Sequence, residues 1–292
     1  MARRWLMMVG LFVGTVTIPA AAVHAQCILY AAQAADEDER DLLILDPKTG
    51  EGTPVGDIGA ETTGLAFHPF TGIMYGATAQ IVSGSLDDEL LITIDLATGA
   101  GTEVGPFNAG RTMADLAFDP TTGVLYGWRA QSTGDLHIIN QNTGSAMFVG
   151  ESGLALLGGQ GLAFGPGNQL FLAGEGTEGL LRTIDKATGL PISSVQLSGY
   201  AFQDNINALA YDGKTLFGVT NDHSELITIN PTTGNITTIG HAGIPEEDSV
   251  DAIEFRCVQA SPAAHHFTLL AIAAGLLVIG VGVSRRRFSQ PA

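Results

Sequence analysis

The chain has 292 residues with 30 acidic and 13 basic side chains, so its formal net charge at pH 7 is −17. All 30 acidic residues lie between positions 26 and 262, where only 8 basic residues accompany them, so this region carries −22. Such a field repels phosphate backbones, which excludes nucleic acid as a partner and favours cations or basic surfaces. The alternative is that the charge serves solubility alone.

The first 25 residues have the pattern of a secretory signal peptide. Arg3 and Arg4 stand at the start, residues 5–18 are apolar, and residues 20–25 are mostly small. A basic start, an apolar stretch and a small-residue exit are typical of a cleaved export signal. We therefore expect cleavage before Gln26 and export of the rest of the chain, with an uncleaved membrane anchor as the alternative.

The central region repeats at intervals of 45 to 49 residues. A Thr-Gly pair recurs, and a short polar residue, Asp or Asn, stands four positions before its glycine. The glycines are Gly50, Gly99, Gly144, Gly189 and Gly234. Self-similarity at such a period indicates a repeat architecture, in which each repeat is one supersecondary unit.

Each repeat contains four short strand-like runs joined by turn residues. In the second repeat they are residues 90–94, a run ending at Gly105, a run ending at Phe118 and a run around Tyr126. The Asp-x-x-Thr-Gly connection between the first two runs suits a hairpin loop, because glycine adopts a positive φ without steric cost. Repeated four-stranded units predict an all-β propeller, with a solenoid as the alternative.

The two ends of this region complement each other. Residues 27–32 resemble a fourth strand, while the last repeat stops after its third run at Phe255. The N-terminal strand can therefore complete a fifth blade and remove an open edge. Cys27 and Cys257 fall on the two sides of the connection that this blade lacks, so we predict a disulfide between them. The predicted fold is a five-bladed propeller over residues 26–258.

The C-terminal residues have the pattern of a membrane anchor. Residues 259–266 form a short linker, residues 267–284 are apolar and uncharged, and Arg285, Arg286 and Arg287 follow. Eighteen apolar residues are enough for a helix to span a bilayer, and arginines beyond them favour a cytoplasmic end. We expect one transmembrane helix, with residues 285–292 as a basic cytoplasmic tail.

The repeats resemble those of bacterial secreted or surface β-propellers with the pattern Leu-Tyr…Ile-Asp-x-x-Thr-Gly-x-x-Thr-x-Ile-Gly, which residues 226–240 match best. The C-terminus resembles the sorting tails of bacterial surface proteins, except that Ser261-Pro262-Ala263-Ala264 stands where the familiar Pro-Glu-Pro motif would be. These resemblances imply a bacterial envelope or surface location. They imply no activity, since propellers serve many functions.

The connections between strands divide into two groups. Those from the first to the second strand of a repeat and from the third to the fourth share one side, which we call the turn face. The fourth-to-first and second-to-third connections share the other, which we call the loop face. Most acidic clusters belong to the loop face. Because binding residues are concentrated on loops held by a rigid scaffold, the loop face is the predicted functional face.

Four carboxylates near the starts of first strands form the candidate cation site: Asp41, Glu89, Asp135 and Glu225. We expect the first strand of each repeat to be the innermost strand, so that these side chains gather at the mouth of the central channel. Carboxylate oxygens are the ligands that Ca²⁺ prefers. The alternative is that they are solvated residues at strand starts. His137 and His223 are expected near the acidic face, where they could join such a site. The alternative is that they have surface or packing roles.

Three functions remain open on these grounds. The first is a non-catalytic, membrane-tethered module that binds a protein, glycan or cation through its acidic loop face. The second is a metal-dependent hydrolase, similar to propeller lactonases, with its site at the channel mouth. The third is a structural role in an envelope layer. Nucleophile, zinc and phosphate-loop motifs are absent from the sequence, which favours the first function.

Overall fold

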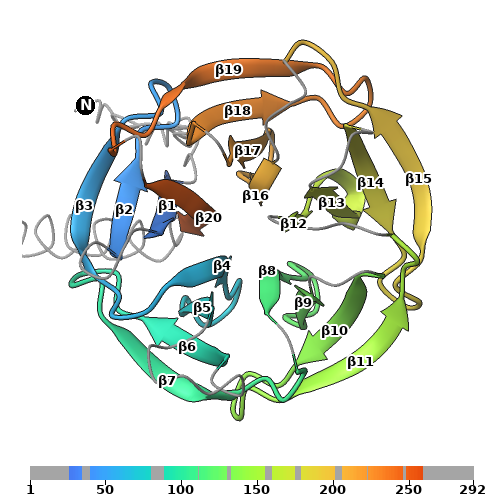
Figure 1. Ribbon diagram of the computed structural model, residues 1–292, viewed down its shortest axis with the longest axis horizontal. Helices are drawn as coiled ribbons and strands as arrows, with labels where there is room; N and C mark the ends of the chain where they lie inside the picture. The colour runs from blue at the N-terminus through green and yellow to red at the C-terminus, as the bar shows by residue number, and fades with distance from the viewer. Residues whose placement is uncertain are drawn as a thin grey trace, which may run out of the picture. The chain divides into compact units, whose positions relative to one another are not determined.

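The computed structural model describes residues 26–34, 40–79, 89–110, 112–129, 133–154, 160–174, 179–200, 206–221, 223–245 and 248–258. The predicted signal peptide, transmembrane helix and basic tail lie outside these residues. Within them, the strands form five antiparallel sheets of four strands each, arranged as blades around one axis (Figure 1). No helix among the described residues has the length and apolar character needed to cross a membrane.

Four blades come from consecutive strands. One blade consists of β4 (Thr62–Phe67), β5 (Met74–Thr78), β6 (Leu90–Ile94) and β7 (Gly101–Pro106), and the next consists of β8 (Met113–Phe118), β9 (Leu125–Arg129), β10 (Asp135–Ile139) and β11 (Ala146–Glu151). A third consists of β12 (Gln160–Phe164), β13 (Leu170–Gly174), β14 (Leu180–Ile184) and β15 (Pro191–Gln196). A fourth consists of β16 (Ile206–Tyr211), β17 (Leu216–Thr220), β18 (Glu225–Ile229) and β19 (Ile236–His241). A short 3-10 helix, η1 (Pro166–Asn168), precedes β13.

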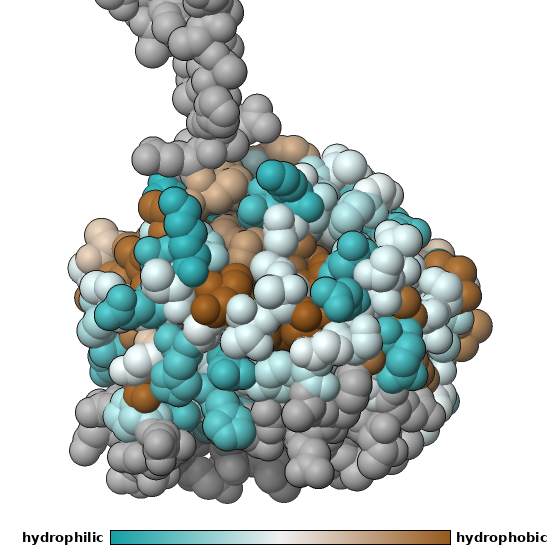
Figure 2. Space-filling view, turned by 90° about the horizontal axis from the view of Figure 1, so that it is seen from above, coloured by the Kyte–Doolittle hydropathy of each residue, from teal (hydrophilic) through white to brown (hydrophobic). Residues whose placement is uncertain are grey.

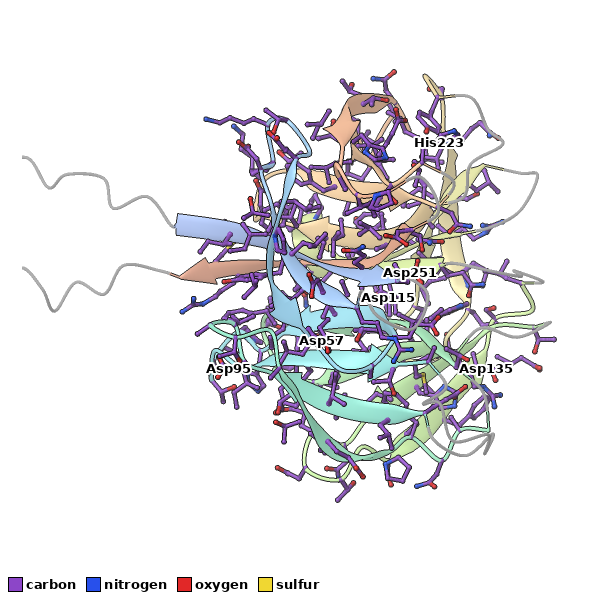
Figure 3. All side chains as sticks on the ribbon, turned by 60° about the vertical axis from the view of Figure 1, so that its left-hand side comes forward. Asp57, Asp95, Asp115, Asp135, His223 and Asp251 are labelled. Atoms are coloured by element: carbon purple, nitrogen blue, oxygen red, sulfur yellow. A yellow bond between two sulfur atoms is a disulfide. The ribbon has the colours of Figure 1, made fainter. Side chains whose placement is uncertain are left out.

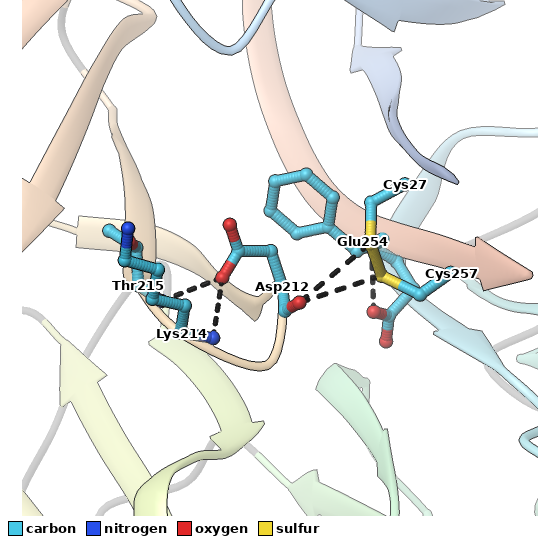
Figure 4. The surroundings of a disulfide bond; sticks show 7 residues. Cys27, Asp212, Lys214, Thr215, Glu254 and Cys257 are labelled. Carbon is cyan, nitrogen blue, oxygen red and sulfur yellow. Dashed lines mark hydrogen bonds between the residues drawn. A yellow bond between two sulfur atoms is a disulfide. The ribbon is translucent and has the colours of Figure 1, made fainter. Parts of the chain in front are cut away.

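The fifth blade joins the two ends of the propeller, as predicted. Strand β20 (Ser249–Val258) pairs with β1 (Gln26–Ala34), which is followed by β2 (Asp41–Leu45) and β3 (Gly52–Asp57). The predicted Cys27–Cys257 disulfide is present, with 4.0 Å between the two α-carbons and 230 positions between them in sequence. Both sulfur atoms lie 3.7 Å from the carbonyl oxygen of Asp212, in the β16–β17 turn (Figure 4).

The order of strands within a blade corrects one expectation. The innermost strand is the third of each repeat, namely β4, β8, β12, β16 or β20, and the first strand lies third from the axis (Figure 1). Strands β4, β8, β12 and β16 contact their neighbours around the axis. Their residues are almost all buried, whereas β15 is exposed along most of its length. Small buried side chains fit the crowded axis, and polar strands belong at the solvated rim.

The recurring geometry of the turns follows from their side chains. In the β2–β3 turn, the Asp46 carboxylate accepts a hydrogen bond from the Lys48 backbone N–H at 2.8 Å, and Gly50 has a φ of 82°. The equivalent carboxylate of Asp95 accepts from the Ala97 N–H at 2.8 Å. An Asx side chain followed by glycine in the left-handed region closes such a turn without strain. Polar side chains and apolar patches alternate over the rim (Figure 2).

Candidate functional site

The loop face and the turn face lie at opposite ends of the propeller. Asp95 lies in a turn at one end, while Asp135 and His223 lie at the other (Figure 3). Much of the loop face falls outside the described residues, including these predicted acidic positions: Asp36, Glu37, Asp38, Glu39, Asp87, Asp88, Glu175, Glu178, Asp222, Glu246 and Glu247. Their assignment to the loop face therefore rests on the sequence and on the ends of the strands that flank them.

The two faces differ strongly in charge. The loop-face connections contain 15 acidic and 2 basic residues, and the turn-face connections contain 6 acidic and 3 basic residues. The loop-face acids are Asp36–Glu39, Glu61, Asp87–Glu89, Glu175, Glu178, Asp204, Asp222 and Glu246–Asp248. The negative field of the propeller is thus concentrated at the end where the connections vary most in sequence.

The four predicted cation ligands do not converge on the channel. Each belongs to a first strand or the residue before it, so each lies in a different blade and three strands from the axis. Asp135 forms an ion pair with Arg129 of the neighbouring strand. Glu89 accepts a hydrogen bond from the Thr112 hydroxyl at 2.7 Å, and Glu225 accepts one from the Tyr200 hydroxyl at 2.6 Å. These three carboxylates therefore pair with nearby protein side chains and not with one another.

The described residues offer no other cluster of ligand type: among them, no three His, Cys, Asp or Glu side chains are arranged to hold a metal ion. Whether Asp41, Glu89, Asp135 or Glu225 binds Ca²⁺ with help from the rest of the loop face stays a prediction. Their expected meeting at the channel mouth is corrected by the strand order, because only the third strand of each repeat lines the axis.

His137 is buried in β10, beside the outermost strand of its own blade. It is only 4% exposed, its ring packs edge-on against Phe148 with 5.7 Å between ring centroids, and its Nδ1 atom has no hydrogen-bond partner. Burial, reinforced by the nearby positive charge of Arg129, lowers the pKa of His137 below its usual value. A neutral, packed imidazole is what these surroundings favour.

The axis itself carries carboxylates that the sequence reasoning missed. Asp115 in β8 is completely buried. Its carboxylate accepts hydrogen bonds from the backbone N–H of Leu116 at 2.8 Å and of Leu162, in the next blade, at 2.7 Å. Burial raises the pKa of Asp115 well above its usual value, the backbone bonds oppose that rise, and Glu254 adds to it. Asp115 therefore links two innermost strands while favouring its protonated form.

Glu254 lies in β20, the innermost strand of the closing blade. The residue keeps some solvent-accessible surface, but its carboxylate is closely surrounded by protein atoms, and this burial raises its pKa to about 8. The carboxylate accepts a hydrogen bond from the backbone N–H of Phe255 at 2.6 Å, and a backbone bond from Phe67 of the neighbouring blade also opposes the rise. Like Asp115, it joins two blades beside the axis.

A second pair of carboxylates lies nearer the loop face. Asp251 accepts hydrogen bonds from Ser249 at 2.7 Å and from the Asn207 side-chain amide at 3.1 Å, and burial raises its pKa. Burial and the charge of Asp251 raise the pKa of Glu61 as well. Asp115 and Asp251 both lie in the interior of the propeller, on different innermost strands (Figure 3).

A sequence signal for two of these acids was available. At the position of Asp115 the other innermost strands have glycine or alanine, namely Gly64, Gly161, Ala208 and Ala252. At the position of Glu254 they have alanine, namely Ala66, Ala117, Ala163 and Ala210. A carboxylate at a position where the other repeats have glycine or alanine departs from the repeat pattern, and such departures point to a structural or functional role.

One family model and several solved structures are similar to this chain. A family model described as a repeat of unknown function (DUF6923) matches residues 157–252, less than half of the chain. No curated protein matches it. A chain in the crystal structure of a nidogen/laminin complex is similar, with a TM-score of 0.54, 12% identity and coverage of 80% of this chain and 100% of the other.

Two bacterial structures are also similar. Myxococcus xanthus glutaminyl cyclase has a TM-score of 0.44 and 16% identity, with 68% of this chain and 71% of that one covered. TolB from Acinetobacter baumannii has a TM-score of 0.47 and 14% identity, with 75% and 53% covered. At such identities the likeness of these structures concerns the fold, and the chain is a repeat-containing five-bladed β-propeller.

Proposed function

We propose that this protein is an exported, membrane-tethered binding module that holds its turn face toward the membrane and its acidic loop face toward a cationic partner. The observation that carries the proposal is that both ends of the propeller lie on the turn face, opposite the concentration of negative charge. The partner is a basic protein surface or a cation, because these are what a carboxylate-rich surface attracts.

The position of the propeller's ends follows from strand register. Leu29, near the start of β1, pairs with Leu45 at the end of β2, immediately before the β2–β3 turn. The start of β1 therefore lies at the turn face, and the disulfide brings Cys257 to the same place. An eight-residue linker, 259–266, spans at most about 28 Å when extended. A membrane helix after it would keep the turn face near the bilayer.

Electrostatics favour the same orientation. Anionic lipid headgroups repel a surface with an excess of carboxylates, and the repulsion acts over roughly a Debye length of 10 Å at moderate salt. The turn face, with 6 acidic and 3 basic residues in its connections, is repelled far less than the loop face. The loop face is then free to meet soluble or surface-bound partners.

The test uses the full chain in lipid nanodiscs and a fluorescent lysine-rich decapeptide as the probe. We expect the double variant Glu37→Gln/Glu39→Gln to weaken peptide binding several-fold, with a shallower dependence on salt. The matched control is Glu51→Gln/Glu103→Gln, which removes the same charge from exposed residues outside the loop face. Calcium titration of the same proteins, with Asp135→Asn, tests the cation. Equal effects in both double variants, or no binding, would contradict the proposal.

A further inference from the structure

The closing blade differs from the other four on the turn face. In those blades, the residue after the aromatic end of the innermost strand starts the turn to the next strand: His68, Asp119, Gly165 and Asp212. In the closing blade Arg256 stands at this position, and the Cys27–Cys257 disulfide replaces the turn. In the other four blades, these turn residues cover the junction with the following blade. The closing blade lacks them.

Another junction shows what such a position normally contacts. Asp119 is almost fully buried, and its carboxylate forms an ion pair of 2.5 Å with Lys186 in the β14–β15 turn of the next blade. Asn168, from the turn before β13, donates a further hydrogen bond to Asp119 at 3.1 Å. This junction is filled by paired charges. At the closing junction, the residue equivalent to Lys186 is the apolar Leu96.

A groove of about 590 Å³ occupies the closing junction. Its apolar lining comes from Ile73, Met74, Ile94, Leu96 and Ala97, and Arg256 borders it. Ile73 is 40% exposed, so part of the apolar lining meets solvent. Asp95, Thr93 and Thr102 also border the groove. Pockets of a few hundred cubic ångströms with a largely apolar lining and a few polar or charged groups are typical sites for small ligands.

Arg256 has no partner within the described part of the chain. Its Nε atom is buried without a hydrogen-bond acceptor, and it forms no ion pair with any described carboxylate. Asp95, the carboxylate that borders the groove, accepts the backbone N–H of Ala97 and so serves its own turn. A buried N–H without an acceptor is costly, and the guanidinium that borders the groove has no carboxylate partner among the described residues that would compete with a bound anion.

We propose that this closure groove binds the headgroup of an anionic phospholipid, with the phosphate on Arg256 and the first part of the lipid's apolar portion against Ile73 and Leu96. This proposal rests on the tether of the proposed function, because the tether brings the turn face to the bilayer. Arg256 lies two residues before Val258, where the last strand of the propeller ends, so the groove lies near that end. Guanidinium groups bind phosphate oxygens in paired hydrogen bonds.

The chain's own linker lacks the charge that would match Arg256. Residues 259–266 read Gln-Ala-Ser-Pro-Ala-Ala-His-His and contain no carboxylate that could pair with Arg256. A partner of the loop face is excluded by position, since the groove lies at the other end of the propeller. A headgroup that joins a phosphate to apolar chains matches both the cation and the lining.

The experiment measures binding of soluble short-chain lipids to the full chain in non-ionic detergent by calorimetry. Dioctanoyl phosphatidylglycerol is the anionic probe, dioctanoyl phosphatidylcholine carries the same acyl chains without net charge, and inorganic phosphate carries the charge without the chains. We expect the glycerol lipid to bind at least tenfold more tightly than either control. Arg256→Gln should remove about tenfold of that affinity, Arg256→Lys should retain part of it, and Lys48→Gln, which removes a cation elsewhere on the turn face, should have no effect.

A second variant guards against a folding defect at Arg256. Ala97→Trp fills the exposed edge of the groove without changing charge and should also weaken lipid binding. Equal binding of both lipids, binding of phosphate alone as tight as lipid, or loss with Lys48→Gln would overturn the proposal. Glu37→Gln/Glu39→Gln should leave lipid binding unchanged, so failure of the loop-face proposal and failure of this one are separable.

Discussion

Gly50 and Gly240 meet where the last outer strand reaches the first turn of the ring. A β-carbon placed on Gly50 would lie 2.5 Å from the carbonyl oxygen of Gly240. The same contact recurs between Gly56 and Gly99 and at two further junctions, Gly105 with Gly144 and Gly150 with Gly189. The Val-Gly and Thr-Gly pairs of the repeat are therefore two halves of one contact between neighbouring blades.

Gly50→Ala should destabilise the propeller by more than its backbone conformation alone would cost. Gly50 has a φ of 82°, a region that costs a residue with a β-carbon about 1–2 kcal/mol. The contact with Gly240 should add about 1–3 kcal/mol of overpacking. Gly59→Ala is the matched control, because Gly59 has a φ of 83° but open space around it. Urea unfolding of both variants measures the difference, and equal losses would show that the contact is unimportant.

Loss of the closing disulfide should destabilise the ring as a whole. The bond joins residues 230 positions apart, so it restrains nearly the entire propeller. Removing a bond that closes so long a loop typically costs about 2–5 kcal/mol. We expect Cys27→Ser/Cys257→Ser to lose this amount in urea unfolding and to become insensitive to reductant, whereas the wild-type protein should lose it only after reduction. A double variant as stable as the oxidised protein would show that β1–β20 pairing suffices.

The repeat pattern predicts the blade boundaries and the ring closure because their causes are local. An Asx turn, a glycine with positive φ and a missing final strand are all visible in consecutive residues. The distance of each strand from the axis is a property of the assembled ring, which explains why the first strand was wrongly expected to be innermost. Burial supplies the missing information: the third strands combine Leu, Ala and aromatic residues, while second strands such as β15 are mostly exposed.

The candidate site was predictable only in part for the same reason. Asp135 and Glu225 occupy equivalent places in their repeats, but equivalent places on a ring are held apart by the blades between them. Only strands at the axis bring equivalent residues together. Asp115 and Glu254 lie on such strands, and their positions could have been read from the sequence as interruptions of small residues. Their hydrogen bonds to neighbouring blades could not be predicted in this way, because almost every residue has a backbone N–H group and the sequence does not show which one a carboxylate will meet.

Asp115→Ala should cost more stability than Asp115→Asn. The carboxylate accepts the backbone N–H groups of Leu116 and Leu162, and alanine would leave both without a partner inside the propeller. An unsatisfied buried donor costs about 1–3 kcal/mol. Asparagine keeps one acceptor oxygen and can satisfy one of the two N–H groups, so it is the matched control for the loss of that bond. We expect urea unfolding to show a loss of about 1–3 kcal/mol for the alanine variant relative to asparagine. Equal stabilities would mean that water satisfies these N–H groups.

Glu254 should make the propeller less stable as pH rises. Its pKa is about 8 in the folded protein, against 4.5 for a glutamate free of such surroundings, so between these values the folded chain holds a proton that the unfolded chain releases. Stability from this group is therefore greatest below pH 4.5, falls through the interval and stops changing above pH 8. Asp115, Asp251 and Glu61 have raised pKa values too and act in the same direction.

Glu254→Gln removes the titrating group while keeping an acceptor for the Phe255 N–H. Urea unfolding at pH 5, 7 and 9 should show wild-type stability falling by about 2–4 kcal/mol over this range, and the variant should lose most of that fall. Glu103→Gln, an exposed residue of β7, should leave it intact. A variant with the full wild-type pH dependence would assign the effect to the other three acids, since Glu254 would then be ionised in the folded protein throughout.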